Sequence, residues 1–188
     1  MNKLKVWRHT IFTPLPVTKC HTFSDPLPPL ERDILYGRPL TETHLSQDID
    51  DNEINIENYT LFRIDRNRHG GGIAIYCRSE LEPTLISSLN VQGIEIFWIQ
   101  VTVQKNKILF GTCYRPPNQT ADERKIFIDG LHSTFETIID KIKKPFVLLG
   151  DFNDRWNNTW GRDHTDSELK FDLVNLINDF NLTLLLRR

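Results

Sequence analysis

The 188-residue sequence lacks several features that would indicate a membrane or secreted protein. Charged residues interrupt every window, so no apolar run approaches the ~18 residues that a transmembrane helix requires. Near the N-terminus, Arg8, His9 and Pro14 break the apolar stretch that a signal peptide would need. We therefore expect an intracellular protein that does not cross a membrane.

Cysteine and excess positive charge are also scarce. Cys20, Cys77 and Cys113 are odd in number and far apart, with no C-x-x-C pair, which argues against a disulfide framework or a zinc site. The formal net charge of −2 excludes a generally basic surface of the kind that binds nucleic acid without selectivity. Any contact with DNA must therefore be local.

The distribution of proline divides the chain. The length fits a single domain, yet six of the ten prolines fall within the first 39 residues. Proline removes a backbone donor and disfavours helix in the preceding residue. We predict that residues 1–33 are poorly ordered and that residues 34–188 form the folded domain.

Beyond Leu40, β-branched and aromatic residues recur in short runs separated by glycine or polar turns, which is typical of strands. The predicted strands are residues 60–65, 72–78, 81–86, 94–103, 107–115 and 146–152. A helix is predicted over residues 122–143, with a buried stripe of Ile126, Leu131, Phe135, Ile138, Ile139 and Ile142. A second follows Ser167 as its N-cap, with Leu169, Leu173, Val174, Leu176, Ile177 and Phe180 facing the core.

Two of these strands are apolar on both sides of the pleat. In residues 94–103, apolar side chains occupy both alternating sets, and residues 146–149 are all apolar. Such strands belong to sheets that are covered on both faces. The pattern predicts an α/β sandwich with helices outside the sheets.

Polar residues follow the apolar strand that ends at Leu149. Asp151 and Asn153 are two positions apart, so an extended backbone places them on one side while Phe152 points into the core. A carboxylate and an amide at a strand end can together face a substrate. Asp and Asn also terminate strands simply as turn formers, so the segment alone does not establish a function.

Two further segments contain candidate site residues. Tyr114 and Arg115 end another predicted strand and could donate to phosphate oxygens, although a surface tyrosine beside a solvated arginine fits equally well. Glu42 lies between two threonines near a third strand end, where most glutamates are simply exposed.

A glycine run and a basic cluster allow two interpretations each. His69 precedes Gly70 to Gly72, but a strand rather than a helix follows, which favours a hairpin connection over a phosphate-binding loop. Arg63, Arg66 and Arg68 could contact a DNA backbone, or could simply be a solvated strand end.

Considered together, these segments resemble a known family. Glu-Thr-His-Leu at residues 42–45, Gly-Gly-Gly-Ile-Ala-Ile-Tyr at 70–76, Cys-Tyr-Arg-Pro-Pro at 113–117 and Leu-Gly-Asp-Phe-Asn at 149–153 occur in the order found in the endonuclease/exonuclease/phosphatase superfamily. More narrowly, residues 34–186 resemble the apurinic-type endonuclease domain of non-LTR (LINE-like) retrotransposon reverse transcriptases.

The resemblance implies a DNase I-like, four-layer αββα sandwich, here incomplete, with a Mg2+-dependent phosphodiesterase site in which Mn2+ is an alternative. Transferred by motif, Glu42 is the metal ligand, Tyr114 contacts phosphate, Asp151 orients or deprotonates water, and Asn153 is a phosphate- or Asp-orienting amide. One carboxylate plus water and substrate phosphate suits Mg2+. The implied partner is DNA, which would be nicked in the nucleus if it is chromosomal. The nick would prime reverse transcription by a reverse transcriptase domain that this chain does not include.

Two parts of the family pattern are not found. No strand with an asparagine is apparent before Glu42, and no closing Ser-Asp-His segment is present; Asp163 and His164 lie in a polar loop and do not replace it. We therefore expect impaired catalysis. The alternatives are a phosphoester phosphatase of the same superfamily and an inactive remnant that at most binds DNA or a partner.

Overall fold

The computed structural model describes residues 10–13, 39–67, 69–153 and 168–186. The described strands are β1 (Thr10–Thr13), β2 (Pro39–Thr41), β3 (Tyr59–Ile64), β4 (Ile73–Arg78), β5 (Thr84–Leu85), β6 (Glu95–Val103), β7 (Asn106–Tyr114), β8 (Phe146–Asp151) and β9 (Thr183–Leu186). The helices are α2 (Ala121–Glu136), its π-helical extension η4 (Thr137–Ile142) and α3 (Glu168–Asp179). Short 3-10 turns are η1 (Asp51–Ile54), η2 (Ser79–Leu81) and η3 (Ser87–Leu89).

The strands form two sheets. The larger has the order β5-β6-β7-β8-β1-β9, and the smaller has the order β2-β4-β3. Strands β7 and β8 pair in parallel, whereas the other described strand pairs are antiparallel. The connection from β7 to β8 runs through α2, as a parallel pair requires a crossover.

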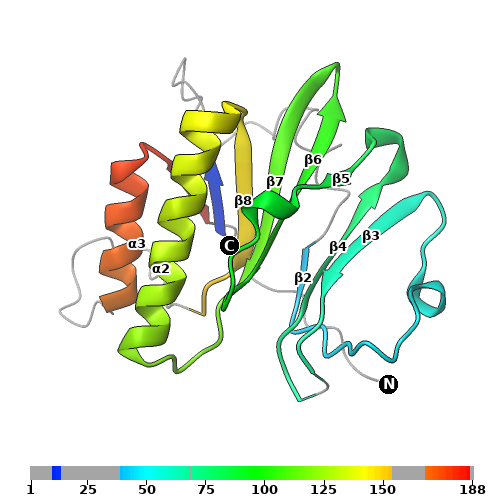
Figure 1. The fold of residues 1–188 in the computed structure, drawn as a ribbon, viewed down its shortest axis with the longest axis horizontal. Helices are drawn as coiled ribbons and strands as arrows, with labels where there is room; N and C mark the ends of the chain where they lie inside the picture. The colour runs from blue at the N-terminus through cyan, green and yellow to red at the C-terminus, as the bar shows by residue number, and fades with distance from the viewer. Residues whose placement is uncertain (1–9, 14–38, 68, 154–167, 187–188) are drawn as a thin grey trace.

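Two hydrophobic cores lie on opposite faces of the larger sheet. Helices α2 and α3 cover one face, and the smaller sheet lies against the other (Figure 1). Strand β6 contributes to both cores, because Ile96 and Trp98 face the helices while Phe97, Ile99 and Val101 face the smaller sheet. The predicted α/β class is therefore confirmed, and the described residues form three of the four expected layers.

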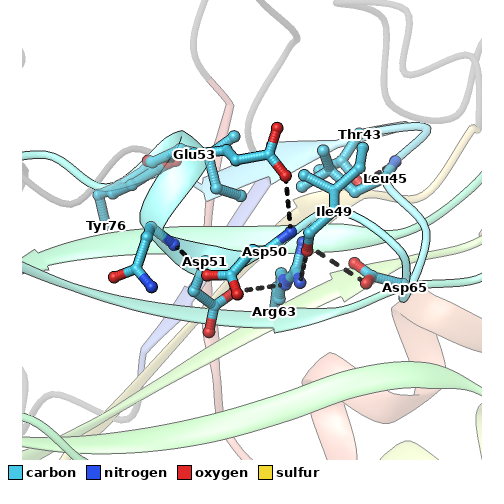
Figure 2. A network of polar contacts seen from close by, with 11 residues as sticks. Thr43, Leu45, Ile49, Asp50, Asp51, Glu53, Arg63, Asp65 and Tyr76 are labelled. Atoms are coloured by element: carbon cyan, nitrogen blue, oxygen red, sulfur yellow. Dashed lines mark hydrogen bonds and ion pairs between the residues drawn. The ribbon is translucent and has the colours of Figure 1, made fainter.

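The outer face of the smaller sheet is covered by the segment between β2 and β3. Arg63 on β3 donates to the Ile49 carbonyl at 2.6 Å and pairs with Asp51 at 2.9 Å and Asp65 at 3.6 Å (Figure 2). Tyr76 on β4 donates to the Ile54 carbonyl at 2.6 Å. Within the described ranges, this face is thus covered by a loop containing η1 rather than by an α-helix.

Most predicted strands are confirmed, with boundaries shifted by at most one residue. The exception is the strand predicted over 81–86, which is reduced to the two residues of β5. Leu81 instead ends the 3-10 turn η2. Pro83 follows, and its missing N–H prevents a longer ladder there. The hairpin interpretation of the glycine run is confirmed, because β3 and β4 pair in antiparallel fashion on either side of it.

The prediction that residues 1–33 are poorly ordered is wrong for Thr10–Thr13. These residues form β1, which lies between β8 and β9 in the larger sheet. Strand β9 was not predicted either, because a short leucine run fits a helix as well as a strand. The rest of residues 1–33 lies outside the described residues, so the domain boundary stays a prediction.

The first predicted helix is confirmed, but two of the residues predicted for its buried face are exposed. Its N-cap is Thr120, which forms a capping box with Glu123. Phe127 is fully buried, whereas the predicted core residue Ile126 is half exposed. Spacing from Phe127 to Leu131 and Phe135 keeps these side chains on one helical face, and this excludes Ile126. Ile139, also predicted to be buried, is exposed as well.

The second helix is confirmed as α3, and Leu173, Leu176 and Ile177 are buried as predicted. The predicted N-cap Ser167 lies outside the described residues. Across the described part of the chain, no helix combines the length and the apolar character needed to span a bilayer.

Candidate active site

The carboxyl ends of β7 and β8 place two candidate residues side by side. In the parallel register, Tyr114 lies opposite Asp151. The Arg115 N–H donates to the Asp151 carbonyl at 2.9 Å and extends the pairing by one bond. Both strand ends therefore lie at the same edge of the larger sheet, where sites are commonly built in α/β folds.

Asp151 and Asn153 are joined by a tight turn. The Asn153 N–H donates to Asp151 Oδ1 at 2.8 Å, and the Asn153 side-chain amide donates to the Arg115 carbonyl at 2.8 Å. Phe152 is buried and packs edge-on against Phe127, as the alternation predicted. Asn153 has φ 47°, a left-handed conformation that asparagine tolerates well. The turn thus fixes both polar side chains beside β7.

Glu42 reaches the same place from the smaller sheet. It follows β2 directly, and its Oε1 accepts a 2.8 Å hydrogen bond from the Tyr114 hydroxyl, 72 residues away in sequence. Its φ of 52° is left-handed, which costs an ordinary residue about 1–2 kcal/mol. Local strain of this kind concentrates at functional sites. The structure therefore brings Glu42 and Tyr114 into contact and places Asp151 and Asn153 on the neighbouring strand end.

The electrostatics of Tyr114 reflect this crowding of carboxylates. Burial raises the pKa of the Tyr114 hydroxyl well above its usual range, and the hydrogen bond to Glu42 and the charges of Glu42 and Asp151 raise it further. The nearby Arg66 charge acts in the opposite direction. Tyr114 is therefore a neutral donor at physiological pH, suited to orienting an oxygen rather than to acting as a base.

The basic residues of the region make internal contacts. Arg115 is buried and its Nη1 donates to the Pro116 carbonyl at 2.9 Å, so its predicted contact with phosphate stays a prediction. Arg63 pairs with Asp51, and Arg66 pairs with Glu95 at 3.1 Å. The local DNA contact proposed for this cluster therefore competes with these ion pairs. Arg68, like Asp163 and His164, lies outside the described residues.

The fit of a divalent cation depends on two carboxylates. Among the described residues, no group of three or more His, Cys, Asp or Glu side chains gathers into a ligand cluster. Mg2+ does not need one, because it retains several waters and uses one or two carboxylates with substrate phosphate. Glu42 uses Oε1 to accept from Tyr114, which leaves its second oxygen for a cation, and Asp151 lies next to Tyr114 in register. These residues fit Mg2+ or Mn2+.

Sequence reasoning did not identify Glu95 as part of this region. Glu95 pairs with Tyr114 across β6 and β7, and its side chain is mostly buried. Its Oε2 accepts from the Gly72 N–H at 2.6 Å. Burial raises its pKa, against the effects of the Gly72 bond and the Arg66 charge. The available signal was a lone carboxylate at the start of an otherwise apolar strand.

The model of the Endonuclease/Exonuclease/phosphatase family matches residues 21–174, which is well over half of the chain. No curated protein gives a significant match.

Solved structures also align with this chain. The endonuclease domain of TRAS1, a telomere-specific non-LTR retrotransposon, aligns with 66% of the chain at 15% identity and a TM-score of 0.49. A humanized D. rerio TDP2 aligns with 62% at 19% identity and a TM-score of 0.44, and the human Nocturnin catalytic domain with 62% at 13% identity and a TM-score of 0.45. The alignments cover 53%, 52% and 51% of those chains, about half of each.

Proposed function

The chain belongs to the Endonuclease/Exonuclease/phosphatase family, and we propose that it hydrolyses a phosphodiester bond of DNA with a divalent cation. The observation that supports this most directly is the convergence of Glu42, Tyr114, Asp151 and Asn153 from two sheets. Glu42 and Asp151 both lie near Tyr114, and the charges of both act on its hydroxyl. Like charges near one group disfavour each other, and a bound cation relieves this.

Each side chain has a distinct role in the proposed reaction. Asp151 orients and accepts a proton from the attacking water, since a carboxylate beside a strand end can reach solvent. Asn153 orients the Asp151 carboxylate by donating its backbone N–H to Oδ1. Tyr114 donates its hydroxyl to Glu42 or to a phosphate oxygen. These residues thereby bind and align the phosphodiester with the water.

Glu42, with Asp151 nearby, would hold Mg2+ or Mn2+. A bound cation of this type polarises a phosphoryl oxygen and stabilises the leaving oxygen. Glu42 is kept in place for this role by the hydrogen bond from Tyr114, because its left-handed backbone needs support from neighbouring groups.

The proposed substrate is duplex DNA, nicked to leave a 3′ hydroxyl. Support comes from the pairing of Cys-Tyr-Arg-Pro-Pro at residues 113–117 with Leu-Gly-Asp-Phe-Asn at 149–153, which resembles retrotransposon endonucleases. In that setting, the 3′ hydroxyl would prime a reverse transcriptase acting in cis.

The test is nicking of supercoiled plasmid in the presence of Mg2+. We expect Asp151→Ala and Glu42→Gln each to reduce the rate by about 10²- to 10⁴-fold, the range for loss of a general base or comparable group. The exposed Asp140 lies on η4 and serves as control, so Asp140→Ala should leave the rate unchanged. Nicking that survives Asp151→Ala would reject the assignment.

The same assay distinguishes the alternatives. Phosphate release from phosphoinositides without plasmid nicking would favour a phosphatase of the same family. DNA binding that shows no Mg2+-stimulated cleavage and does not change in Glu42→Gln would instead favour a non-catalytic protein.

A further inference from the structure

The two sheets are linked beside the site by adjacent residues of the larger sheet. Glu95 and Tyr114 are directly opposite in the antiparallel pair of β6 and β7, so their side chains lie on the same face. Tyr114 belongs to the core between the sheets, and this face is therefore the one that meets the smaller sheet. Each of the two residues bonds to a group of the smaller sheet or its loops.

Glu95 makes two such bonds. Its Oε2 accepts from the Gly72 N–H at 2.6 Å, and its Oε1 pairs with Arg66 Nη1 at 3.1 Å. Arg66 also donates to the Gly70 carbonyl at 2.9 Å, and its guanidinium carbon lies 5.9 Å from the centre of the Tyr114 ring. A single carboxylate thus holds both ends of the turn that leads into β4.

This turn in turn holds the segment that contains Glu42. The Gly72 carbonyl accepts from the Thr43 N–H at 3.3 Å, and the Gly71 carbonyl accepts from the His44 N–H at 3.2 Å. Gly72 has φ 82°, and a Cβ there would lie 2.5 Å from Thr43 Oγ1, so only glycine allows this approach. The chain of contacts from Glu95 therefore ends at the two residues after Glu42.

Glu42 needs this support because regular pairing does not supply it. Strand β2 ends at Thr41, and both Glu42 and His44 have left-handed backbones, with φ 52° and 54°. Without these bonds, nothing in the strand pairing of β2 would hold the Glu42 carboxylate at the Tyr114 hydroxyl on the other sheet. The contacts form a closed loop. Tyr114 donates to Glu42, the next residue Thr43 donates to the Gly72 carbonyl, the Gly72 N–H donates to Glu95, and Glu95 is the cross-strand neighbour of Tyr114.

We propose that Glu95 is a positioning residue, which fixes Glu42 at Tyr114 by holding the Gly72 N–H and Arg66. Only the expected effect of Glu95 on DNA cleavage rests on the proposed function. The arrangement of the backbone is independent of any reaction, and it can be measured without substrate or metal.

The first measurement is amide hydrogen exchange in the full chain without metal. We expect Glu95→Ala to accelerate exchange at Gly72, Thr43 and His44 by about tenfold or more, because these amides lose their shared anchor. Glu95→Gln retains a neutral acceptor for the Gly72 N–H and should restore most of the protection. Glu80→Ala is the control, since Glu80 forms a comparable pair with Arg78 at 2.9 Å away from the site and should leave these amides unchanged.

The second measurement is cation binding and cleavage. We expect Glu95→Ala to weaken Mn2+ binding and to lower kcat for plasmid nicking by about 10- to 100-fold, as a displacement near 1 Å does, with a smaller change in KM. Glu95→Gln should again recover most of both. Arg66→Gln removes the ion pair, the bond to the Gly70 carbonyl and the contact with the Tyr114 ring, but it leaves the bond from the Gly72 N–H to Glu95 in place, so it should fold and show a smaller effect in the same direction.

Unchanged exchange at Thr43 and His44 in folded Glu95→Ala would overturn the proposal. If Glu95→Ala does not fold, unchanged exchange at these amides in Arg66→Gln would do so instead. A native chain that neither binds Mn2+ nor nicks DNA would reject the proposed function, while the exchange data would still decide the role of Glu95.

Discussion

The two sheets position their site residues by different physical means. On the larger sheet, Tyr114, Asp151 and Asn153 follow directly from strand register and a tight turn between two hydrophobic cores. On the smaller sheet, Glu42 lies beyond a three-residue strand in a strained backbone, held by individual hydrogen bonds. Polar contacts therefore matter most where the ladder is shortest.

The comparison extends to how each sheet is covered. The larger sheet has apolar cores on both faces, whereas the outer face of the smaller sheet is covered by a loop attached through Arg63 and Tyr76. A layer packed by many apolar contacts does not depend on any single polar contact. A layer attached by a few charged or hydrogen-bonding groups depends on each of them, because removing one leaves its buried partner unpaired. Substitutions in each region should show this difference.

The largest expected effect is at Arg63. Arg63→Gln leaves the carboxylate of Asp65, whose side chain is only 8% exposed, without its ion-pair partner and also removes the link to Ile49. Leaving a buried charge unpaired should destabilise the protein by about 3 kcal/mol, measured by urea unfolding. The exposed pair of Arg78 and Glu80 is the control, and Glu80→Gln, at a side chain that is 67% exposed, should not change the unfolding midpoint measurably. Equal effects of both substitutions would contradict the comparison.

The next effect tests the larger sheet. A Cβ at Gly150 would lie 2.4 Å from the Cys113 carbonyl oxygen, which is fixed in the β7 ladder. Gly150→Ala should therefore cost about 2 kcal/mol through overpacking, measured by thermal unfolding. At Gly130 the same Cβ would meet only side-chain methyl groups at 3.0 Å, and alanine favours helix there. A loss of stability in Gly130→Ala as large as in Gly150→Ala would refute this explanation.

A smaller effect concerns the helical layer over the larger sheet. The Thr120 hydroxyl caps α2 by accepting from the Glu123 N–H at 3.2 Å. Thr120→Ala should destabilise the protein by about 1 kcal/mol, whereas Thr120→Ser should retain most of the stability. Urea unfolding of both variants measures the difference, and indistinguishable midpoints would exclude a contribution from the cap.

The smallest effect is a pH dependence at Glu95. Because burial raises its pKa in the folded state, the folded protein binds the proton more tightly than the unfolded chain. The contribution of Glu95 to the free energy of unfolding is therefore greatest below its unfolded pKa, and it is lost as the pH rises through its folded pKa. Relative to Glu95→Gln, the native protein should lose stability as the pH rises above the ordinary range of a glutamate carboxyl, about 4.3. A difference in Tm that stays constant over this rise in pH would contradict the raised pKa.

Regular, strongly apolar strands were predictable from the sequence. Strands β6 and β8 are apolar on both faces, and such a pattern has few other structural solutions. The short terminal strands were not predictable, because β1 and β9 have only four residues each and depend on partners far away in the chain. The same holds for Ile126 and Phe127, where the neighbouring layer decides which side chain is buried.

The candidate site was predicted in part for the same reason. Asp151 and Asn153 were expected to lie together through strand alternation, but β8 ends at Asp151, and it is a turn, closed by the Asn153 N–H donating to Asp151, that brings them together. Glu95 was missed, because its role arises from Gly72 and Arg66 in another sheet and its own neighbours are ordinary strand residues.

The sequence by itself determined the local chemistry, namely which carboxylates, amides and hydroxyls end the buried strands, since side-chain alternation and apolar runs act over a few residues. Only the tertiary structure decided that Glu42 meets Tyr114 across 72 residues and that Glu95 links the two sheets. Such contacts depend on how the two sheets pack, and this packing is a property of the whole folded chain rather than of any segment.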